Sequence, residues 1–199
     1  MGILLGTRTT PVIQTRQCHT IVCERLFRLD TNQIRAHELQ QREEHPSGLQ
    51  LVVRKRPNSE YNCHGLTFLN RRAWLSSVPN VDMILDDDHY DMIEPHNVII
   101  GDIAIYYEML PDMENKTIIH TGVVVGQPEE LQLSLNTQLS VYSTTELERK
   151  FPWVLSKWGS WGEYIHRANY GPYMNRKPSK IKGEQDSYII RYMREGKND

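Results

Sequence analysis

The order of its segments predicts that this chain is an α+β protein with an antiparallel sheet. Helix-forming segments lie in the first half, and short stretches rich in β-branched or aromatic residues, separated by turn residues, occupy the second half. Because the helices precede the strands instead of alternating with them, an antiparallel sheet is favoured over a parallel one. The predicted strands of the second half are residues 98–107, 117–125, 139–142, 153–158, 164–166 and 188–192.

The first expected helix covers residues 32–44. Asp30 or Thr31 can cap its start, and the Pro-Ser-Gly sequence at 46–48 ends it. A short strand is expected directly afterwards, over residues 49–53.

A second helix is expected over residues 66–75. Leu66, Leu69 and Ala73 recur there at near-helical spacing, and residues 76–79 are expected to stop the helix.

Composition indicates an ordinary globular protein. The chain has 199 residues, of which 39% are hydrophobic and 24% charged, and its net charge is −2. This charge gives no drive toward nucleic acid or membranes, and no apolar run approaches the roughly 20 residues of a membrane helix. The cysteines, Cys18, Cys23 and Cys63, are few and odd in number, which favours a reducing compartment. We therefore expect a cytoplasmic protein with neither a nucleic-acid nor a membrane partner.

We expect a single domain over 1–199, divided into an N-terminal extension (1–45), a catalytic core (46–170) and a C-terminal extension with a last strand (171–199). Charge is uneven along it: residues 82–102 hold seven acidic and no basic residues, and 171–199 hold seven basic and four acidic ones. Each segment is most simply a solvated surface, and the alternative is a surface that attracts a charged partner.

Cys63 is the candidate nucleophile. It lies just before a predicted helix, where the helix dipole and unpaired backbone N–H groups favour the thiolate over the thiol. Gly65, two residues later, would let a substrate approach closely.

His120 is the candidate base. Adjacent residues of a helix point about 100° apart, so His64 is not expected to face Cys63, and the base should come from another segment. His120 interrupts the apolar run of a predicted strand, where an imidazole is costly to bury without a partner. Gly122, on the same face of that strand, is expected to leave open space beside it.

Three motifs in a fixed order carry a resemblance to a known group of enzymes. They are Asn62-Cys63-His64-Gly65, then Gly101-Asp102-Ile103-Ala104, and then His120-Thr121-Gly122-Val123-Val124-Val125-Gly126. In this order they resemble the papain-like NlpC and CHAP amidase/peptidase families, over about half of the chain (59–166). The resemblance implies a papain-like fold, a Cys nucleophile, a His base and a third polar residue on the next strand, which together hydrolyse an amide bond.

Three residues are candidates for the third polar residue: Ser156, Lys157 and His166. An orienter must accept a hydrogen bond from the far nitrogen of His120, and Lys157, which can only donate, drops out. We expect His166 in this role, with Ser156 as the runner-up.

The remaining expectations concern substrate binding. The backbone N–H of Cys63 and the Tyr61 hydroxyl are expected to hold the oxyanion, and Asn62 and Gly65 to line the substrate site. No cofactor or metal is required for this chemistry. The expected substrate is a peptide or protein, acyl transfer to an acceptor other than water is open, and a partner protein is possible.

Two alternatives stand beside the enzyme. Cys18-His19, Cys23 and Cys63-His64 could assemble a zinc site, although the adjacent Cys63 and His64 make poor ligands for one tetrahedron. The chain could also be a non-catalytic interaction module, because its second half is rich in amphipathic aromatics. These are Tyr61, Tyr106, Tyr107, Trp153, Trp158, Trp161, Tyr164, Tyr170 and Tyr173.

Overall fold

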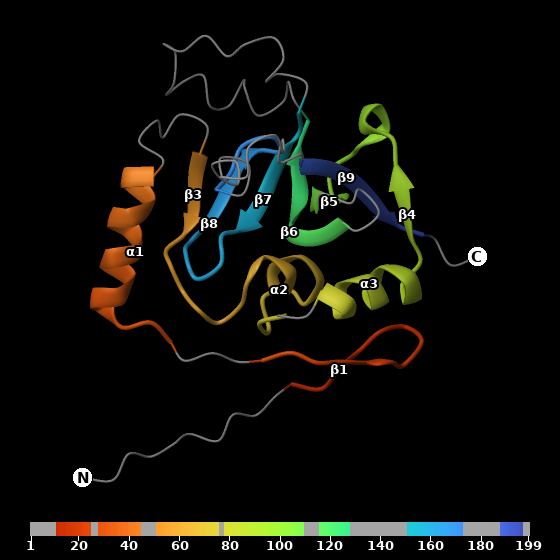
Figure 1. Ribbon diagram of the computed structural model, residues 1–199, viewed down its shortest axis with the longest axis horizontal. Coiled ribbons are helices and arrows are strands. Elements are labelled where there is room, and N and C mark those ends of the chain that lie inside the picture. Colours follow the sequence, from red (N-terminus) through yellow and green to blue (C-terminus); the bar gives the residue numbers. More distant parts are fainter. Residues whose placement is uncertain are drawn as a thin grey trace.

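An antiparallel sheet forms the centre of the structure, a computed structural model that describes residues 11–24, 28–44, 51–75, 78–109, 116–127, 151–172 and 188–196. Within these ranges the sheet has seven strands in the order β3-β8-β7-β6-β5-β9-β4, and every neighbouring pair is antiparallel (Figure 1). The strands are β3 (Leu51–Lys55), β4 (Tyr90–Ile93), β5 (Ile103–Met109), β6 (Lys116–Gly126), β7 (Trp153–Lys157), β8 (Glu163–Arg167) and β9 (Tyr188–Glu195). The predicted α+β class with an antiparallel sheet is confirmed.

Three helices accompany the sheet in the described part of the chain: α1 (Thr31–Glu44), α2 (Cys63–Phe68) and α3 (Val78–Asp87). Figure 1 shows α2 and α3 side by side along the sheet and α1 beside its edge strand β3. A 3-10 turn, η2 (Pro95–Asn97), precedes β5, and β1 (Ile13–Gln14) and β2 (Thr20–Ile21) form a separate hairpin beneath the helices. None of these helices combines the length and apolar character that a membrane crossing needs.

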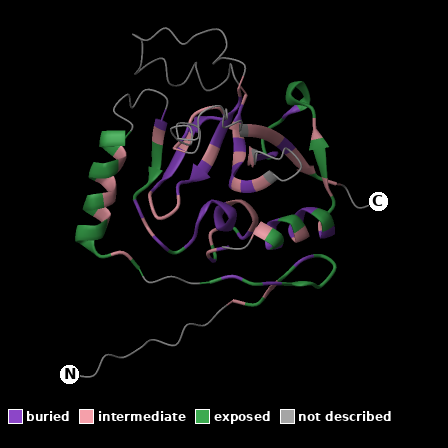
Figure 2. Ribbon diagram, viewed as in Figure 1, coloured by how far each residue is buried: buried purple, intermediate pink, exposed green. Residues whose placement is uncertain are grey.

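Side-chain alternation along β5 divides the core into two layers. Ile103 and Ile105 pack with Ile84 of α3 in one apolar cluster, whereas Ala104 and Tyr106 belong to a second cluster. This division follows from the period of a strand, whose successive side chains point to opposite faces. Figure 2 shows the resulting burial concentrated in the central strands and in α2.

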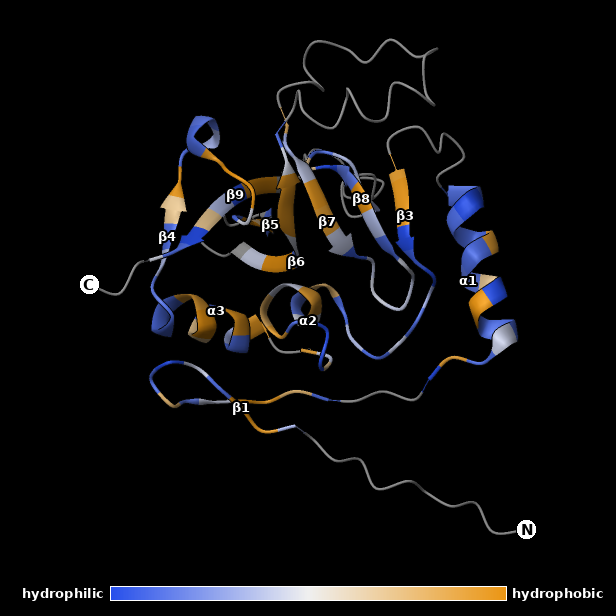
Figure 3. Cartoon of the chain, turned by 180° about the vertical axis from the view of Figure 1, so that it is seen from behind, coloured by the Kyte–Doolittle hydropathy of each residue, from blue (hydrophilic) through white to orange (hydrophobic). Residues whose placement is uncertain are grey.

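The first helix starts close to its predicted position. The Asp30 side chain accepts hydrogen bonds from the backbone N–H groups of Asn32 and Gln33, at 2.8 and 2.9 Å, and so caps α1. No residue of α1 is buried, and Figure 3 shows that the helix is mostly hydrophilic. An ion pair from Arg56 to Glu38, at 2.7 Å, connects α1 to the chain that follows β3.

The prediction of a helix over 66–75 was wrong in both its start and its end. The helix runs over Cys63–Phe68 because the Asn62 side chain caps it one turn earlier. It ends there because Asn70 and Arg71 adopt left-handed backbone conformations, with φ of 45° and 65°.

Helix α3 lies where the sequence predicted a stop and then an acidic surface. Pro79 occupies its first turn, where a helix needs no proline N–H, so this proline does not prevent the helix. Val81, Ile84 and Leu85 recur at helical spacing and are buried, which explains why the helix forms despite its acidic residues.

The predicted boundaries of one strand and of the N-terminal extension also differ from the structure. The strand predicted at 98–107 begins only at Ile103, after η2 and the left-handed Gly101 (φ 99°). Ile21 and Cys23, from the expected N-terminal extension, pack into the core cluster that contains Ile103. The strand predicted at 139–142 lies outside the described residues.

Candidate active site

The loop before α2 holds Cys63 at the first position of the helix. The Oδ1 atom of Asn62 accepts the N–H groups of Gly65 (2.9 Å) and Leu75 (3.1 Å), and its Nδ2 donates to the Leu75 carbonyl (2.7 Å). Asn62 is therefore a buried cap with its amide engaged on the protein itself, and the expected contact with substrate is not supported. Cys63 itself is buried, with 4% of its surface exposed.

Gly65 serves packing and not substrate approach. A Cβ atom at this position would lie 1.9 Å from the carbonyl oxygen of Ala73, so the returning chain already fills the space that was expected for substrate. The Gly65 carbonyl also accepts hydrogen bonds from the N–H groups of Leu69 and Arg71, at 3.2 and 2.9 Å. The glycine thus lets the chain fold back tightly beneath the nucleophile.

Two imidazoles interact with the Cys63 thiol, those of His64 and His120. Burial alone would raise the pKa of Cys63, but the positive charges of His64 and His120, and their hydrogen bonds to the sulfur, outweigh burial and hold this pKa well below its usual value. The structure therefore brings the predicted nucleophile and the predicted base together and adds a second histidine. A thiolate in such surroundings is the reactive form of cysteine.

His64 was excluded on geometric grounds, and the structure corrects this. Its Nδ1 lies 3.0 Å from Thr121 Oγ1 of β6, and the ring is 7% exposed. Burial would lower the pKa of His64, but the charge of the Cys63 thiolate and a hydrogen bond to it outweigh burial and raise this pKa. The angle of about 100° between adjacent helix residues describes the directions of their Cβ atoms. The imidazole of His64 extends well beyond its Cβ atom and can therefore reach the sulfur of Cys63 in the first turn of this short helix.

A β-bulge precedes His120. In the β5–β6 register, Tyr106 pairs with His120 and Tyr107 with Ile118, so Ile119 is the extra residue. Bulges re-aim the side chains beside them and are common next to active sites. The His120 ring is 1% exposed and lies against the Tyr106 ring, with centroids 5.1 Å apart.

The space expected beside Gly122 does not exist. A Cβ atom there would lie 2.4 Å from Val154 Cγ1 and 3.0 Å from the carbonyl oxygen of Leu155, because Gly122 pairs with Ser156 across β6 and β7. This glycine allows close contact between two strands and does not open a substrate site.

Ser156 and His166, the candidates for the third polar residue, form a buried chain of hydrogen bonds. Ser156 Oγ lies 2.7 Å from His166 Nε2 and accepts from the Trp158 indole N–H at 3.0 Å. The other ring nitrogen of His166, Nδ1, lies 2.8 Å from the Arg167 carbonyl, so Nδ1 carries the proton and Nε2 accepts from the serine. His166 thereby orients Ser156 directly, and its role toward His120 stays a prediction.

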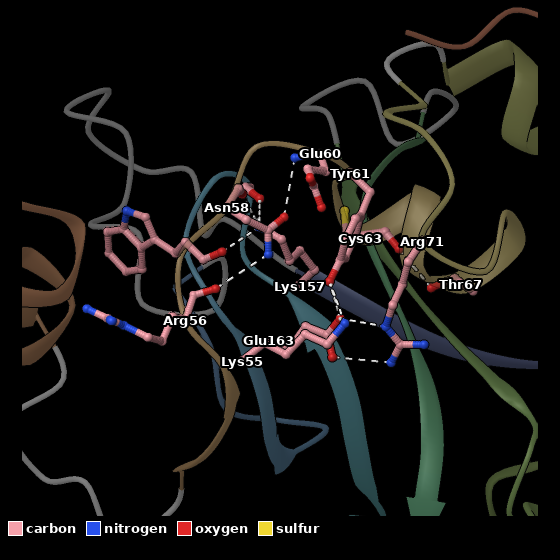
Figure 4. Close-up of polar contacts among 12 residues, drawn as sticks. Lys55, Arg56, Asn58, Glu60, Tyr61, Cys63, Thr67, Arg71, Lys157 and Glu163 are labelled. Atoms are coloured by element: carbon pink, nitrogen blue, oxygen red, sulfur yellow. Dashed lines mark hydrogen bonds and ion pairs between the residues drawn. The ribbon is translucent and has the colours of Figure 1, made fainter. Parts of the chain in front are cut away.

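A polar cluster built around Glu163 lies in the same region as Cys63 (Figure 4). This cluster was not predicted from the sequence. The Glu163 carboxylate is 2% exposed and accepts two hydrogen bonds from the Arg71 guanidinium, at 2.6 and 3.2 Å. Tyr61 donates its hydroxyl to the same carboxylate. Burial would raise the pKa of Glu163, but these hydrogen bonds and the neighbouring positive charges lower it.

The Tyr61 hydroxyl is therefore committed to Glu163 and does not serve as the expected oxyanion donor. Burial, together with this hydrogen bond and the charge of Glu163, raises the pKa of Tyr61 and keeps the phenol protonated. A signal for the cluster was present in the sequence, because Lys157 and Glu163 are charged residues within predicted or adjoining strand segments.

Lys157 is fully buried beside this cluster. Its ammonium donates to the carbonyls of Asn58 (2.8 Å), Gly159 (2.6 Å) and Trp161, and it lies 5.5 Å from the centroid of the Tyr61 ring. Burial lowers the pKa of Lys157 to about 7, against the opposing charges of Glu163 and Cys63. Lys157 thus connects the loop that leads to the nucleophile with the turn between β7 and β8.

The zinc alternative is not supported. Cys18 is exposed, Cys23 is buried against the Pro11 carbonyl at 3.3 Å, and Nδ1 of His19 lies 2.7 Å from the Asp87 carboxylate. Across the described ranges, no three His, Cys, Asp or Glu side chains converge as metal ligands.

The aromatic residues of the second half mostly form the core. Tyr61, Tyr106, Trp153, Trp158 and Tyr164 are each at most 5% exposed, so they do not offer a recognition surface. Tyr173 lies outside the described residues.

No family model, curated protein or solved structure matches the chain significantly. The chemistry of the site therefore rests on its geometry. A thiolate flanked by two imidazoles, at the start of a buried helix, can attack an electrophilic carbon and exchange protons with the groups that leave and enter.

Proposed function

We propose that this protein is a papain-like cysteine hydrolase that cleaves an amide bond, most simply in a peptide or protein. The observation that carries the proposal is the contact of the Cys63 thiol with the imidazoles of His64 and His120, which lowers the pKa of the thiol. The order of the elements supports it as well, because the cysteine helix, the Gly-Asp strand and the histidine strand follow one another onto one antiparallel sheet.

In the first half of the reaction, the Cys63 thiolate attacks the carbonyl carbon of the substrate. The C–S bond forms while the carbonyl electron pair moves onto oxygen. The proposed donors to this oxyanion are the N–H groups of Cys63 and His64, because the first N–H groups of a helix have no partner within it. His120 then gives its proton to the amine nitrogen as the C–N bond breaks, which leaves a thioester on Cys63.

In the second half, neutral His120 takes a proton from water, and the resulting hydroxide attacks the thioester carbon. The C–S bond breaks, the carboxylic product leaves, and the sulfur returns to the thiolate that the two imidazoles stabilise. A thiolate is best protected from oxidation in a reducing compartment, and the sequence predicts a cytoplasmic location.

p-Nitrophenyl acetate tests the proposal without knowledge of the natural substrate. The full chain is expected to release a burst of p-nitrophenolate and to carry an acetyl group on Cys63, visible by peptide mass spectrometry. The acetyl group should disappear with time as water hydrolyses the thioester. Cys18, which is exposed, is the internal reference for an ordinary thiol. Acetylation of Cys63 no faster than that of Cys18 would contradict the proposal.

A further inference from the structure

Cations outnumber carboxylates beside Cys63. The single charge of Glu163 is matched by Arg71, whose guanidinium makes two hydrogen bonds to it at 2.6 and 3.2 Å. Lys55 lies near the same carboxylate, with Nζ 3.8 Å from Oε1, and Lys157 interacts electrostatically with both Glu163 and Cys63. The cluster of Lys55, Arg71, Lys157 and Glu163 therefore has a positive excess.

Neighbouring charges do not cancel this excess. Glu60, in the loop before Cys63, forms an ion pair with Arg28 at 2.8 Å, and Arg56 pairs with Glu38 at 2.7 Å. Each of these pairs is neutral by itself.

Lys55 is the most exposed cation of this cluster. Its side chain is 52% exposed and that of Arg71 is 32% exposed, whereas Lys157 is fully buried. The Nζ of Lys55 lies 3.4 Å from the hydroxyl of Tyr61 (Figure 4). Tyr61 precedes the nucleophile Cys63 by two residues. The ammonium thus stands at the boundary between the buried cluster and the solvent from which a substrate arrives.

We propose that the site selects substrates with a carboxylate close to the amide bond that is cleaved, and that Lys55 is the residue that recognises this carboxylate. The inference rests on the proposed function of Cys63. A carboxylate fits better than a phosphate, because the Arg71 fork that would clamp a dianion is already occupied by Glu163, and a lysine offers a single point charge.

Iodoacetate and iodoacetamide test this inference, because iodoacetate carries a carboxylate where iodoacetamide carries an uncharged amide. In both reactions the thiolate sulfur attacks the methylene carbon, the C–S bond forms and iodide leaves. The rate ratio of iodoacetate to iodoacetamide is measured separately at Cys63 and at Cys18 by peptide mass spectrometry on the full chain. Dividing the Cys63 ratio by the Cys18 ratio removes the intrinsic difference between the reagents.

We expect Lys55→Gln to lower this normalised ratio by about threefold or more, because the substitution removes a positive charge that attracts the carboxylate of iodoacetate and leaves iodoacetamide unaffected. Arg54→Gln removes the same charge from the exposed neighbour of Lys55 and should leave the ratio unchanged. Equal ratios in the wild type and Lys55→Gln would overturn the inference. If iodoacetamide itself alkylates Cys63 no faster than Cys18, the proposed function fails instead.

Discussion

His64 Nδ1 lies 3.0 Å from Thr121 Oγ1, so the residue after the nucleophile contacts the residue after the predicted base. Two adjacent pairs, Cys63-His64 on α2 and His120-Thr121 on β6, therefore meet across the interface of helix and sheet. This contact fixes the start of α2 against β6 and places both imidazoles beside one sulfur.

Cys63→Ala should abolish turnover while the fold is kept. The substitution removes the only atom that forms the thioester, so the rate should fall by about three orders of magnitude or more. A small buried side chain is replaced by a smaller one, and we expect a loss of about 1 kcal/mol in the free energy of unfolding. The p-nitrophenolate burst and a thermal melting curve measure the two effects. A variant that turns over like the wild type would end the cysteine-hydrolase proposal.

The alkylation of Cys63 should persist below the pH at which an ordinary thiol stops reacting. The pKa of Cys63 is lowered by His64 and His120, so its thiolate is lost only as the pH falls through this lowered value. The rate with iodoacetamide is therefore expected to reach half its maximum well below pH 8.5, roughly the pKa of a free cysteine. A midpoint at or above that pH would show that the thiol is not activated.

The two histidines should be separable by the same measurement. His64→Gln and His120→Gln each remove a positive charge from the thiolate and should shift the alkylation midpoint to higher pH. Only His120→Gln should also block hydrolysis of the acetyl-enzyme, because His120 is the proposed base for water. The sequence alone predicts that loss of His64 is the milder change, whereas its contact with the sulfur predicts a comparable shift. If His64→Gln leaves the midpoint where it is, the second imidazole has no part in activating the thiol.

Lys157→Met should destabilise the protein. The substitution leaves the carbonyls of Asn58, Gly159 and Trp161 without the ammonium that they accept from, at a cost of about 2–4 kcal/mol in the free energy of unfolding. Urea denaturation measures the loss, and Arg54→Met, at an exposed position, is the control. Equal stability of the two variants would show that the buried ammonium does not hold these loops together.

Gly122→Ala should weaken the pairing of β6 with β7. The new Cβ would lie 2.4 Å from Val154 Cγ1, and overpacking of this kind costs about 1–3 kcal/mol. Val154→Ala removes the opposing methyl groups, so the double variant should lose less stability than the sum of the two single variants. Strict additivity in urea denaturation would show that the two positions do not compete for space.

Local pattern was sufficient for most of the strands and for the first helix. Apolar stretches between turn residues marked β6, β7 and β9, and Asp30 marked the start of α1, because these signals depend on neighbours in the chain. It was not sufficient for α2 and α3. Asn62 caps α2 through the Gly65 N–H, and its amide is held in place by Leu75, thirteen residues away. Helix α3 forms because its apolar face packs against the sheet.

The sequence by itself determined the antiparallel α+β class and singled out Cys63 and His120, since a cysteine at a helix start and an imidazole in an apolar strand are unusual wherever they occur. Only the tertiary structure decided that His64 joins them, that Tyr61 serves Glu163, and that Gly65 and Gly122 admit neighbouring chain instead of substrate. The physical reason is that side-chain reach, close packing and the fields of buried charges depend on which segments meet in space, and spacing along a chain carries no record of those distances.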